Sequence, residues 1–447
     1  MEIATIILAA GQGTRMKSSK TKVLHEVCGT PMLEMVLQTA HSISSAINIV
    51  VASPNNINEI SALCGKFSNT EVVLQNEQLG TGHAVKTAFD KSKNLSNFNG
   101  NIYVLYGDTP LITSRTLQKM QTIQNTALTV LGFTSSNPQN NYGRLVCEEV
   151  SNIEFGTLSD ITEIKDNPSA RNHKICNSGV FLGRSEVFKQ YLPKILPSTT
   201  TNEYYLTSLP SLIKQNCHYI LCDESEVLGV NSRSELATCE GILQNRLRKF
   251  HMENGVTIID PNSTFFSLDT KIESDVTIEP NVQMGKNVSI QKNSIIKSFS
   301  YIEGVNIGQG CQIGPFARIR PTTTIGNNSK IGNFVEVKNS NLAHSVKSGH
   351  LSYIGDTDIS ENVNIGAGTV FCNYDGFSKY RSNVEEDVFI GSNSTIISPI
   401  SIKNNSIIAA GTVVTDEVPP NSIAISRSDQ INISDGATRF RQKHHKP

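Results

Sequence analysis

Short apolar runs alternate with helical stretches along the first half of the chain. The runs have the length and β-branched content of buried strands, whereas the segments between them carry apolar residues at helical spacing. The predicted strands are residues 5–8, 47–52, 71–74, 102–106 and 127–133, and two predicted helices are residues 31–41 and 82–91. This alternation predicts a mostly parallel sheet with helices on both faces.

Residues 231–254 carry one long helical pattern. Ser232 followed by Glu235 is the signature of a capping box, which satisfies free N–H groups at the start of a helix. Gly255 is a suitable stop. The apolar residues at roughly helical spacing between them are Leu236, Ile242, Leu243, Leu247 and Phe250.

From residue 255 onward, an internal repeat of six residues dominates the pattern. The periodic positions are Ile272, Ile278, Met284, Ile290, Ile296 and Ile302, then Ile307, Ile313, Ile319, Ile325, Ile331 and Val337, and finally Ile390, Ile396, Ile402, Ile408 and Val414. A period of six fits neither a helix nor an amphipathic strand, and a chance run of isoleucines would not hold its phase over so many positions. The repeat predicts a solenoid of short, flat strands, with one aliphatic side chain per strand pointing inward and Gly or Asn at the corners.

These patterns predict three parts. Residues 1–229 form the first domain, residues 230–254 form a linker helix, and residues 255–447 form the solenoid domain, which ends in a polar, basic tail that we expect to be frayed. The repeat lapses between residues 371 and 390, and a loop that leaves a rigid scaffold is a common place for function.

Composition excludes several classes of function. The 447 residues carry 39 Lys and Arg against 40 Asp and Glu, so a net charge of −1 gives no pull toward nucleic acid or anionic membranes. Nine cysteines without a CxxC pair disfavour a disulfide framework or a zinc ribbon and favour reduced cytosolic thiols. The absence of a long apolar stretch and of a basic leader predicts a cytoplasmic protein.

The segment LAAGQGTRM, residues 8–16, directly follows the first predicted strand. Its glycines allow backbone N–H groups to close around phosphate oxygens, and Arg15 adds positive charge. The loop is neither a Walker loop nor a dinucleotide fingerprint, so an ordinary tight turn is the alternative interpretation. Lys22 follows the loop, and Asp108 ends a strand where a carboxylate beside phosphates suggests Mg²⁺.

Together, these motifs resemble those of sugar-1-phosphate nucleotidyltransferases. The resemblance rests on the glycine loop, Lys22, QLGTGHA at 78–84, YGDTPL at 106–111, YGR at 142–144, NSG at 177–179 and EYY at 203–205. With the hexapeptide solenoid, the chain resembles the bacterial GlmU family over nearly its full length. That family combines UDP-N-acetylglucosamine pyrophosphorylase with glucosamine-1-phosphate N-acetyltransferase.

The resemblance implies both a fold and an activity. The fold is α/β: a Rossmann-like nucleotidyltransferase domain, a linker helix and a left-handed parallel β-helix. The implied enzyme acetylates glucosamine-1-phosphate from acetyl-CoA and then transfers uridylyl from UTP to the product, with release of pyrophosphate. The UDP-N-acetylglucosamine formed would feed peptidoglycan and lipopolysaccharide precursors. A homotrimer is also implied, with each acetyltransferase site assembled from adjacent subunits.

The resemblance assigns roles in the first domain. Asp108 and Asn231 match the ligands of Mg²⁺, Arg15 and Lys22 would hold the triphosphate as catalytic cations, and Gln75 would read the uracil edge. Gly143, Glu163 and Asn177 match contacts to the acetamido sugar. All positions matched to UTP or the sugar nucleotide are Leu8, Ala9, Ala10, Gly11, Lys22, Gln75, Gly80, Thr81, Tyr106, Gly107, Asp108, Gly143, Glu163, Asn177 and Asn231.

Some of these residues have other interpretations, and the sequence differs from the family motifs at two positions. Glu163 and Arg15 are also compatible with solvated surface charges, and Gln75 with a cap on a strand end. The family usually has Pro where this chain has Thr21, which is expected to loosen the loop, and an acid where it has Ser208.

A second cluster surrounds the lapse in the repeat. Arg320 and Lys338 are 18 residues apart, which puts two cations on one face of successive coils, as a phosphate requires; two solvated cations are the alternative. A histidine is suited to remove the proton from an amine that attacks a thioester. A lone His in a turn is more often structural, but SGHLSYIGD matches the family segment with the catalytic base, which points to His350, with Glu336 expected to orient it.

The resemblance assigns the remaining solenoid residues to two substrates. Thr322 stands where the family tends to have Gly, which is expected to disturb the local turn. The glucosamine-1-phosphate site would comprise Arg320, Lys338, Tyr353, Asn364 and Lys379, and the acetyl-CoA site Ala367, Asn373, Tyr374, Ser392, Ala410 and Arg427.

Two other functions are compatible with parts of the pattern. The solenoid of a lone nucleotidyltransferase would serve only oligomerisation and regulation, but such a solenoid has no use for His350 or Lys379. A non-catalytic scaffold that binds sugar nucleotides is the other alternative. It has no need of Asp108, Lys22 and Arg15 together.

Overall fold

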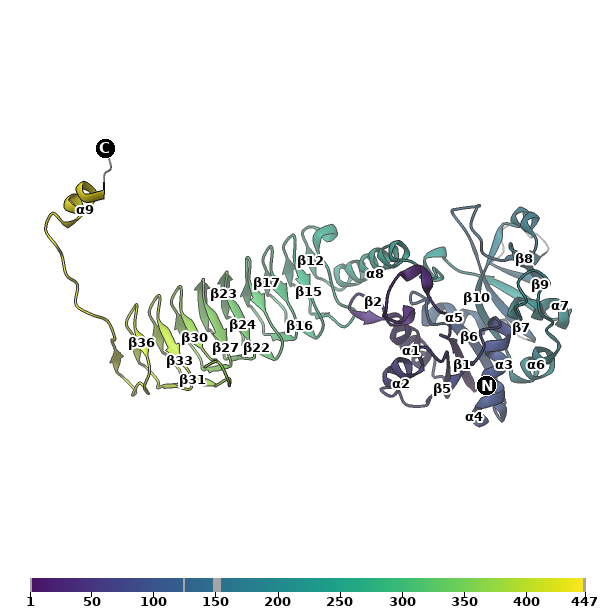
Figure 1. Ribbon diagram of the computed structural model, residues 1–447, viewed down its shortest axis with the longest axis horizontal. Helices are drawn as coiled ribbons and strands as arrows, with labels where there is room; N and C mark the ends of the chain where they lie inside the picture. The colour runs from purple at the N-terminus through teal and green to yellow at the C-terminus, as the bar shows by residue number, and fades with distance from the viewer. Residues whose placement is uncertain (1, 124, 148–153, 445–447) are drawn as a thin grey trace. The chain divides into compact units, whose positions relative to one another are not determined.

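The computed structural model describes residues 2–123, 125–147 and 154–444, and the chain forms two compact units, Met1–Asn245 and Arg246–Pro447 (Figure 1). The division between them falls within the helix α8 (Arg233–Glu253). The limits of the functional domains, 229 and 255, stay a prediction.

The first unit is built on a nine-stranded sheet with the order β5-β4-β1-β6-β10-β7-β11-β9-β8. Its strands are β1 (Ile3–Leu8), β4 (Ile47–Ala52), β5 (Thr70–Leu74), β6 (Asn101–Tyr106), β7 (Leu128–Thr134), β8 (Arg144–Cys147), β9 (Phe155–Thr162), β10 (Ile175–Arg184) and β11 (Cys217–Leu221). A two-stranded ribbon joins β2 (Glu26–Val27) to β3 (Thr30–Pro31). All five predicted strands are present, with ends shifted by at most two residues.

The sheet is mixed rather than mostly parallel, which corrects the prediction from sequence. The strands β5, β4, β1 and β6 are parallel to one another. Beyond them, β10 lies between β6 and β7 and runs antiparallel to both. The prediction missed β8 to β11, so the antiparallel half of the sheet was not foreseen.

Helices cover both faces of this sheet, as the alternation predicts. Ile6 of β1 packs with one helical layer, which includes Val85 and Phe188, whereas its neighbour Ile7 packs with the opposite layer, which includes Val36 and Leu117. Successive side chains of a strand point to opposite faces, so a strand buried on both sides reads as a continuous apolar run. The helices are α1 (Met32–Ser42), α2 (Ile57–Cys64), α3 (Thr81–Lys91), α4 (Lys93–Ser96), α5 (Ser114–Met120), α6 (Ser185–Tyr191) and α7 (Leu209–Ile213).

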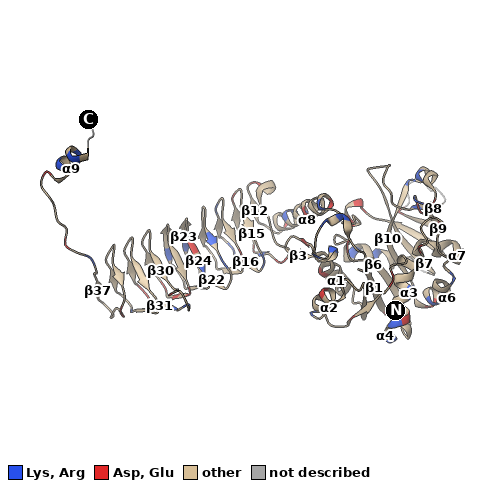
Figure 2. Ribbon diagram, viewed as in Figure 1, with Lys and Arg blue, Asp and Glu red and all other residues tan. Residues whose placement is uncertain are grey.

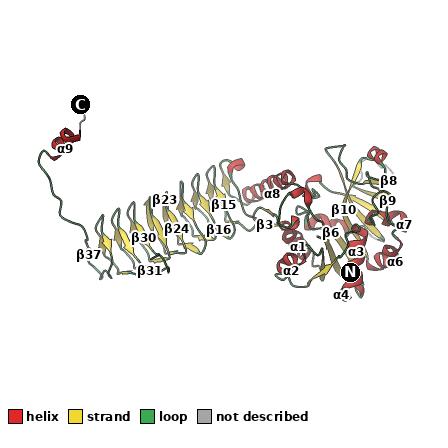
Figure 3. Cartoon of the chain, viewed as in Figure 1, coloured by secondary structure: helices red, strands yellow, loops and turns green. Residues whose placement is uncertain are grey.

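The second unit is a left-handed parallel β-helix. Figure 3 shows its short strands joined by turns. Its first sheet comprises β12 (Thr257–Ile258), β14 (Thr277–Ile278), β17 (Ile295–Ile296), β20 (Gln312–Ile313), β23 (Lys330–Asn333), β26 (Lys347–His350), β29 (Asn364–Ile365), β32 (Phe389–Ile390), β35 (Ile407–Ile408) and β37 (Ile423–Ala424). The second comprises β13 (Lys271–Ile272), β16 (Val288–Ile290), β19 (Val305–Ile307), β22 (Thr323–Ile325), β25 (Asn341–Leu342), β28 (Thr357–Ile359), β31 (Ser382–Val384) and β34 (Ser401–Ile402). The third comprises β15 (Gln283–Met284), β18 (Tyr301–Ile302), β21 (Arg318–Ile319), β24 (Glu336–Lys338), β27 (Tyr353–Gly355), β30 (Val370–Cys372), β33 (Thr395–Ile397) and β36 (Val413–Val414).

The six-residue repeat predicts the core of this unit correctly. Every periodic position is buried except Ile272, which packs partly buried against the same core. Three hexads make one coil, so residues 17 or 18 apart pair, as Ile278 does with Ile296 and Ile296 with Ile313. Where the repeat lapses, Ile365 pairs with Ile390, 25 residues on. The loop that leaves the coil is shorter than the predicted lapse of 371–390, because the coil resumes at β31.

Asparagine and glycine both take the left-handed backbone conformation at corners, as expected, with φ of 70° at Gly310 and 75° at Gly368, and some other glycines serve close stacking. Asparagines such as Asn281 and Asn293 take the left-handed backbone conformation, with φ of 60° and 61°. A glycine such as Gly326 instead permits close approach of coils, because a Cβ there would lie 2.6 Å from the carbonyl carbon of Ala343.

The two helices outside the sheets differ in part from expectation. In α8, the backbone N–H of Glu235 donates to Oγ of Ser232 at 3.3 Å, but the Glu235 carboxylate accepts from the N–H of Asn231, one residue before the expected partner. Phe250 of the predicted apolar face is exposed. Residues Gly436–His444, expected to be frayed, form the helix α9, on which no residue is buried.

The described residues contain neither a membrane-spanning helix nor a disulfide. No helix of the described chain combines the length and apolar character needed to cross a bilayer. All nine cysteines lie in the described part, and none forms a disulfide.

Candidate active sites

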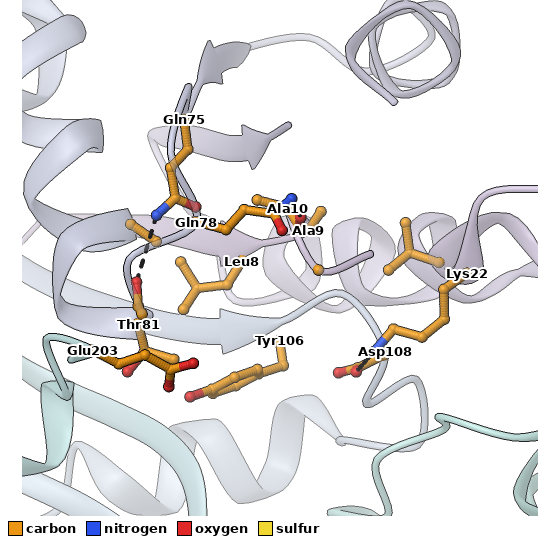
Figure 4. Close-up of a pocket in the computed structure, with 14 residues that line it drawn as sticks. Leu8, Ala9, Ala10, Lys22, Gln75, Gln78, Thr81, Tyr106, Asp108 and Glu203 are labelled. Carbon is orange, nitrogen blue, oxygen red and sulfur yellow. Dashed lines mark hydrogen bonds and ion pairs between the residues drawn. The ribbon is translucent and has the colours of Figure 1, made fainter. Parts of the chain in front are cut away.

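A cavity of about 320 Å³ opens at the carboxyl edge of the parallel strands of the first unit (Figure 4). Leu8 ends β1, Tyr106 ends β6, Gln75 follows β5 and Thr81 begins α3. In an open α/β sheet, this edge is where ligands bind. The cavity is lined by Leu8, Ala9, Ala10, Gly11, Lys22, Val23, Gln75, Gln78, Gly80, Thr81, Ala84, Tyr106, Asp108 and Glu203.

The glycine loop folds over the stem of Lys22. Gly13 has a φ of +64°, and a Cβ at this position would lie 2.6 Å from the Cβ of Lys22. Only glycine accommodates both the conformation and the approach. The loop therefore holds Lys22 in the cavity, whereas Arg15, on the short helix after Gly13, is exposed and not among the lining residues.

Lys22 and Asp108 line this cavity, and Asn231, which is not among the lining residues, meets Lys22 there. The ammonium of Lys22 forms an ion pair with the Asp108 carboxylate and donates to Oδ1 of Asn231 at 3.0 Å. The backbone N–H of Val230 donates to the carbonyl of Asp108 at 2.9 Å, which brings Asn231 beside that strand end. Two oxygens from segments far apart in sequence thus converge on one cation. A carboxylate and an amide oxygen, with room for substrate phosphates, fit a Mg²⁺ ion.

Gly80 permits the close contact that closes another side of the cavity. Its φ is +101°, and a Cβ there would lie 2.7 Å from the carbonyl oxygen of Tyr204. The next residue, Thr81, accepts from the backbone N–H of Leu206 at 3.0 Å. The segment that contains Glu203 therefore packs against the start of α3.

The residues assigned to the sugar form a second group next to Tyr106. A Cβ on Gly143 would lie 3.3 Å from the Glu163 carboxylate, and Asn177 donates its N–H to the carbonyl of Gly143 at 2.8 Å. Thr207 donates to Glu163 at 3.0 Å, and burial raises the pKa of the Glu163 carboxyl. Glu163 is thus not the solvated charge considered as its alternative. Gly107 donates its N–H to the carbonyl of Leu8 and is not among the residues that line the cavity.

Two polar lining residues, Gln78 and Glu203, were quoted in motifs but not assigned roles. Nε2 of Gln78 donates to the carbonyl of Ala10 at 2.6 Å, so it holds the glycine loop against the cavity. Glu203 adds a carboxylate. The sequence signal that could have identified them is their position in the motifs QLGTGHA and EYY.

In the second unit, charged residues of both signs gather around β24 (Figure 2). Arg320 donates to Glu336 at 2.8 Å, so it is paired rather than solvated. The side chains of Lys338 and Lys379 lie together, and the neighbouring Lys338 ammonium lowers the pKa of Lys379. Two adjacent ammonium groups attract a dianion such as a phosphate.

Tyr353 and Asn373 connect this cationic cluster to the loop that leaves the coil. The amide of Asn373 donates to the buried Asp356 and lies 3.4 Å from the Tyr353 hydroxyl. Tyr374 pairs with Lys379 in a small antiparallel bridge, so the loop doubles back on itself. This hairpin is what brings Lys379 to Lys338.

His350 ends β26 on the first sheet, just before the corner that leads to Tyr353. Its Nδ1 is hydrogen-bonded to Oδ1 of Asn333, its register partner on the previous coil. Because an amide oxygen only accepts, Nδ1 carries a proton, and in the neutral ring Nε2 then keeps its lone pair. Glu336, expected to orient His350, pairs with Arg320 instead and is the register partner of Tyr353. Asn333 was missed because only the coil register brings it to His350.

Four of the six residues assigned to acetyl-CoA follow one edge of successive coils, whereas Asn373 and Tyr374 belong to the loop described above. Ala367, Ser392 and Ala410 each lie two residues beyond a paired isoleucine of the first sheet. On the next coil, Arg427 donates to the carbonyl of Ala410 at 2.8 Å. Asn364 lies on the first sheet beside β26, across the corner from the cationic cluster.

Comparison with known proteins identifies the family. Residues 5–139 match the MobA-like NTP transferase domain, residues 269–304 and 304–339 match the bacterial transferase hexapeptide, and residues 383–416 match the hexapeptide repeat of succinyl-transferase. The bifunctional protein GlmU of Paramagnetospirillum magneticum is 40% identical over 98% of this chain and 97% of its own length. That of Maricaulis maris is 46% identical over 98% and 96%. The chain belongs to the GlmU family.

Members of the GlmU family are bifunctional uridylyltransferases and acetyltransferases, and this chain has a domain for each reaction. Nucleotidyltransferases of this kind use a divalent metal ion. The three family matches agree with the geometry, since one falls on the unit with the cavity and the others on the coils that flank His350.

Proposed function

We propose that the two sites act in sequence to make UDP-N-acetylglucosamine in the cytoplasm. The second unit transfers acetyl from acetyl-CoA to glucosamine-1-phosphate, and the first transfers uridylyl from UTP to the product. The observation that carries the first half is the convergence of Asp108 and Asn231 on Lys22, which lines the cavity. The proposed functional domains are residues 1–229 and 255–447, joined by a linker helix.

In the uridylyl transfer, a phosphate oxygen of N-acetylglucosamine-1-phosphate attacks the α-phosphorus of UTP, and pyrophosphate leaves. The protein contributes mainly position and charge. Backbone N–H groups from Ala10 to Gly11 and the cations Lys22 and Arg15 would surround the triphosphate. For Arg15, this requires that its exposed side chain turn toward the bound nucleotide.

Asp108 and Asn231 would hold Mg²⁺. Their oxygens already share one cation, the Lys22 ammonium, which supports their capacity to share another. Magnesium would neutralise the negative charge of the phosphates. Lys22 would then be released to contact a phosphate oxygen.

In the acetyl transfer, the amine nitrogen of glucosamine-1-phosphate attacks the thioester carbon. The C–N bond forms, the C–S bond breaks and coenzyme A leaves as the thiol. Nε2 of His350 would take the proton of the amine, and the hydrogen bond from Nδ1 to Asn333 supports this orientation. The paired Lys338 and Lys379 and the nearby Arg320 would hold the sugar phosphate.

We propose a homotrimer, in which a neighbouring subunit completes each acetyltransferase site. Phe299, Phe316 and Phe334 are 54%, 45% and 55% exposed and stack at one corner, with ring centroids 4.9 and 5.1 Å apart. The next coil continues this ridge with exposed Leu351, adjacent to His350. Exposed apolar ridges mark contacts between proteins. Sedimentation equilibrium that gives a mass other than three chains contradicts the trimer.

The uridylyltransferase proposal is tested by pyrophosphate release from UTP. We expect release with N-acetylglucosamine-1-phosphate and MgCl₂, and its loss when EDTA replaces the metal. Asp108→Asn keeps the shape but removes the charge, so we expect the rate to fall by about 10²-fold. Equal rates with glucosamine-1-phosphate, or no release at all from folded protein, would contradict the proposal.

A further inference from the structure

Gln75 presents a buried amide to the cavity. Its exposed fraction is only 2%, and it lines the cavity directly after β5. Its backbone is anchored by a 2.8 Å hydrogen bond from its N–H to the carbonyl of Ala52. A side-chain amide has a donor end and an acceptor end of nearly equal size. Which end faces the cavity therefore decides what hydrogen-bonding pattern a ligand must have.

The surroundings of Gln75 fix which end is which. One end lies 2.9 Å from Nδ1 of His83 and 3.5 Å from the carbonyl oxygen of Gly80. A carbonyl oxygen only accepts, so the NH₂ group belongs on this side. Nδ1 of His83 must then accept as well, which makes His83 the neutral tautomer with its proton on Nε2. The oxygen Oε1 is left on the side toward Gln78 and Ala10.

We propose that His83 is a positioning residue that selects uracil over cytosine by holding the amide of Gln75 in this orientation. The inference rests on the proposed function, in which the cavity takes UTP. Uracil carries a hydrogen on N3 and donates it to Oε1. Cytosine presents a lone pair at N3, and two acceptors then face each other. A buried polar group left without a hydrogen bond costs binding free energy. The site should therefore bind cytosine more weakly than uracil.

His83 is needed because Gly80 holds the amide only weakly. At 3.5 Å, the contact with the Gly80 carbonyl is at the limit of a hydrogen bond, whereas that with His83 is ideal. Without His83, the amide of Gln75 turns more readily and offers NH₂ to the base. The site would then accept N3 of cytosine. His83 lies in the first turn of α3, so a rigid element sets its position.

Two variants of His83 separate positioning from structural support. His83→Ala removes the acceptor, and alanine is the best helix former, so α3 should remain folded. His83→Asn is the matched control, because its Oδ1 lies near the place of Nδ1 and also accepts. Thermal melting of all three proteins checks their folding. The measured quantity is the ratio of kcat/KM for UTP to that for CTP.

We expect His83→Ala to reduce the UTP to CTP ratio about tenfold, equivalent to about 1.4 kcal/mol. His83→Asn should keep the ratio within about threefold of the wild type. A folded His83→Ala protein with an unchanged ratio, or with both nucleotides impaired equally, overturns the inference. If His83→Ala does not fold, the His83→Asn ratio decides, and a fall of about tenfold overturns the inference.

Failure of the proposed function can be distinguished from failure of this inference about His83. A wild-type protein that releases no pyrophosphate from UTP contradicts the uridylyltransferase itself. A wild-type protein that uses UTP, together with a folded variant of unchanged selectivity, contradicts only the role of His83. Calorimetric titration with UDP and CDP provides a second readout that needs no turnover, and the same change of preference is expected there.

Discussion

Thr322 is held in a backbone conformation that its side chain disfavours. Its φ is +64°, in the left-handed region, which β-branched residues rarely adopt. We expect Thr322→Gly to raise the free energy of unfolding by about 1 kcal/mol, because the relief of strain exceeds the extra chain entropy of glycine. Asn293→Gly is the matched control at another corner, where φ is 61° and asparagine already tolerates it. Denaturant unfolding measures both; a destabilised Thr322→Gly would contradict this account.

At the same scale, individual site residues could be predicted only where a motif carries them. Ten residues assigned to the nucleotide by resemblance line one cavity. The hydrogen bonds of His350 to Asn333 and of Gln75 to His83 were not predicted, since each depends on a register or a turn that no local pattern encodes. Thr21, expected to loosen the loop, donates to Glu59 at 2.5 Å and so ties the loop to α2.

At the scale of elements, the coils of the solenoid depend on glycines that allow close stacking. A Cβ on Gly326 would lie 2.6 and 2.7 Å from the carbonyl carbon and oxygen of Ala343 on the next coil. Backbone cannot rotate away as a side chain can, so we expect Gly326→Ala to lower stability by about 2 kcal/mol. Thermal unfolding of the full chain measures this.

The control for Gly326 is a glycine without such a neighbour. Gly241 lies within α8, and a Cβ there would meet nothing within 4 Å. Gly241→Ala should stabilise by about 0.5–1 kcal/mol through helix propensity. If both alanine variants changed stability in the same direction, close stacking would not be the reason for Gly326.

Elements with a strong period were predictable, and those without one were not. The six-residue repeat located the solenoid core because each inward side chain recurs in phase. The mixed half of the sheet was missed because β10 inserts between β6 and β7, two strands that both come well before it in the chain. Pairing of this kind is a property of tertiary packing, which short apolar runs do not reveal.

At the scale of the whole molecule, two compact units carry two sets of reactive groups. One unit holds Lys22 and Asp108 around the cavity, and the other holds His350 beside the paired lysines. No residue of one set belongs to the other. The two activities should therefore be lost separately when one residue of either set is replaced.

The most direct test compares intact protein with His350→Ala and Asp108→Ala in two assays. One follows thiol release from acetyl-CoA with glucosamine-1-phosphate, and the other follows pyrophosphate release from UTP with N-acetylglucosamine-1-phosphate. We expect folded His350→Ala to lose thiol release by at least about 10²-fold and keep pyrophosphate release, and Asp108→Ala to do the reverse. Undiminished thiol release from folded His350→Ala, or none from intact protein, would contradict the account and leave the solenoid as a scaffold for uridylyl transfer alone.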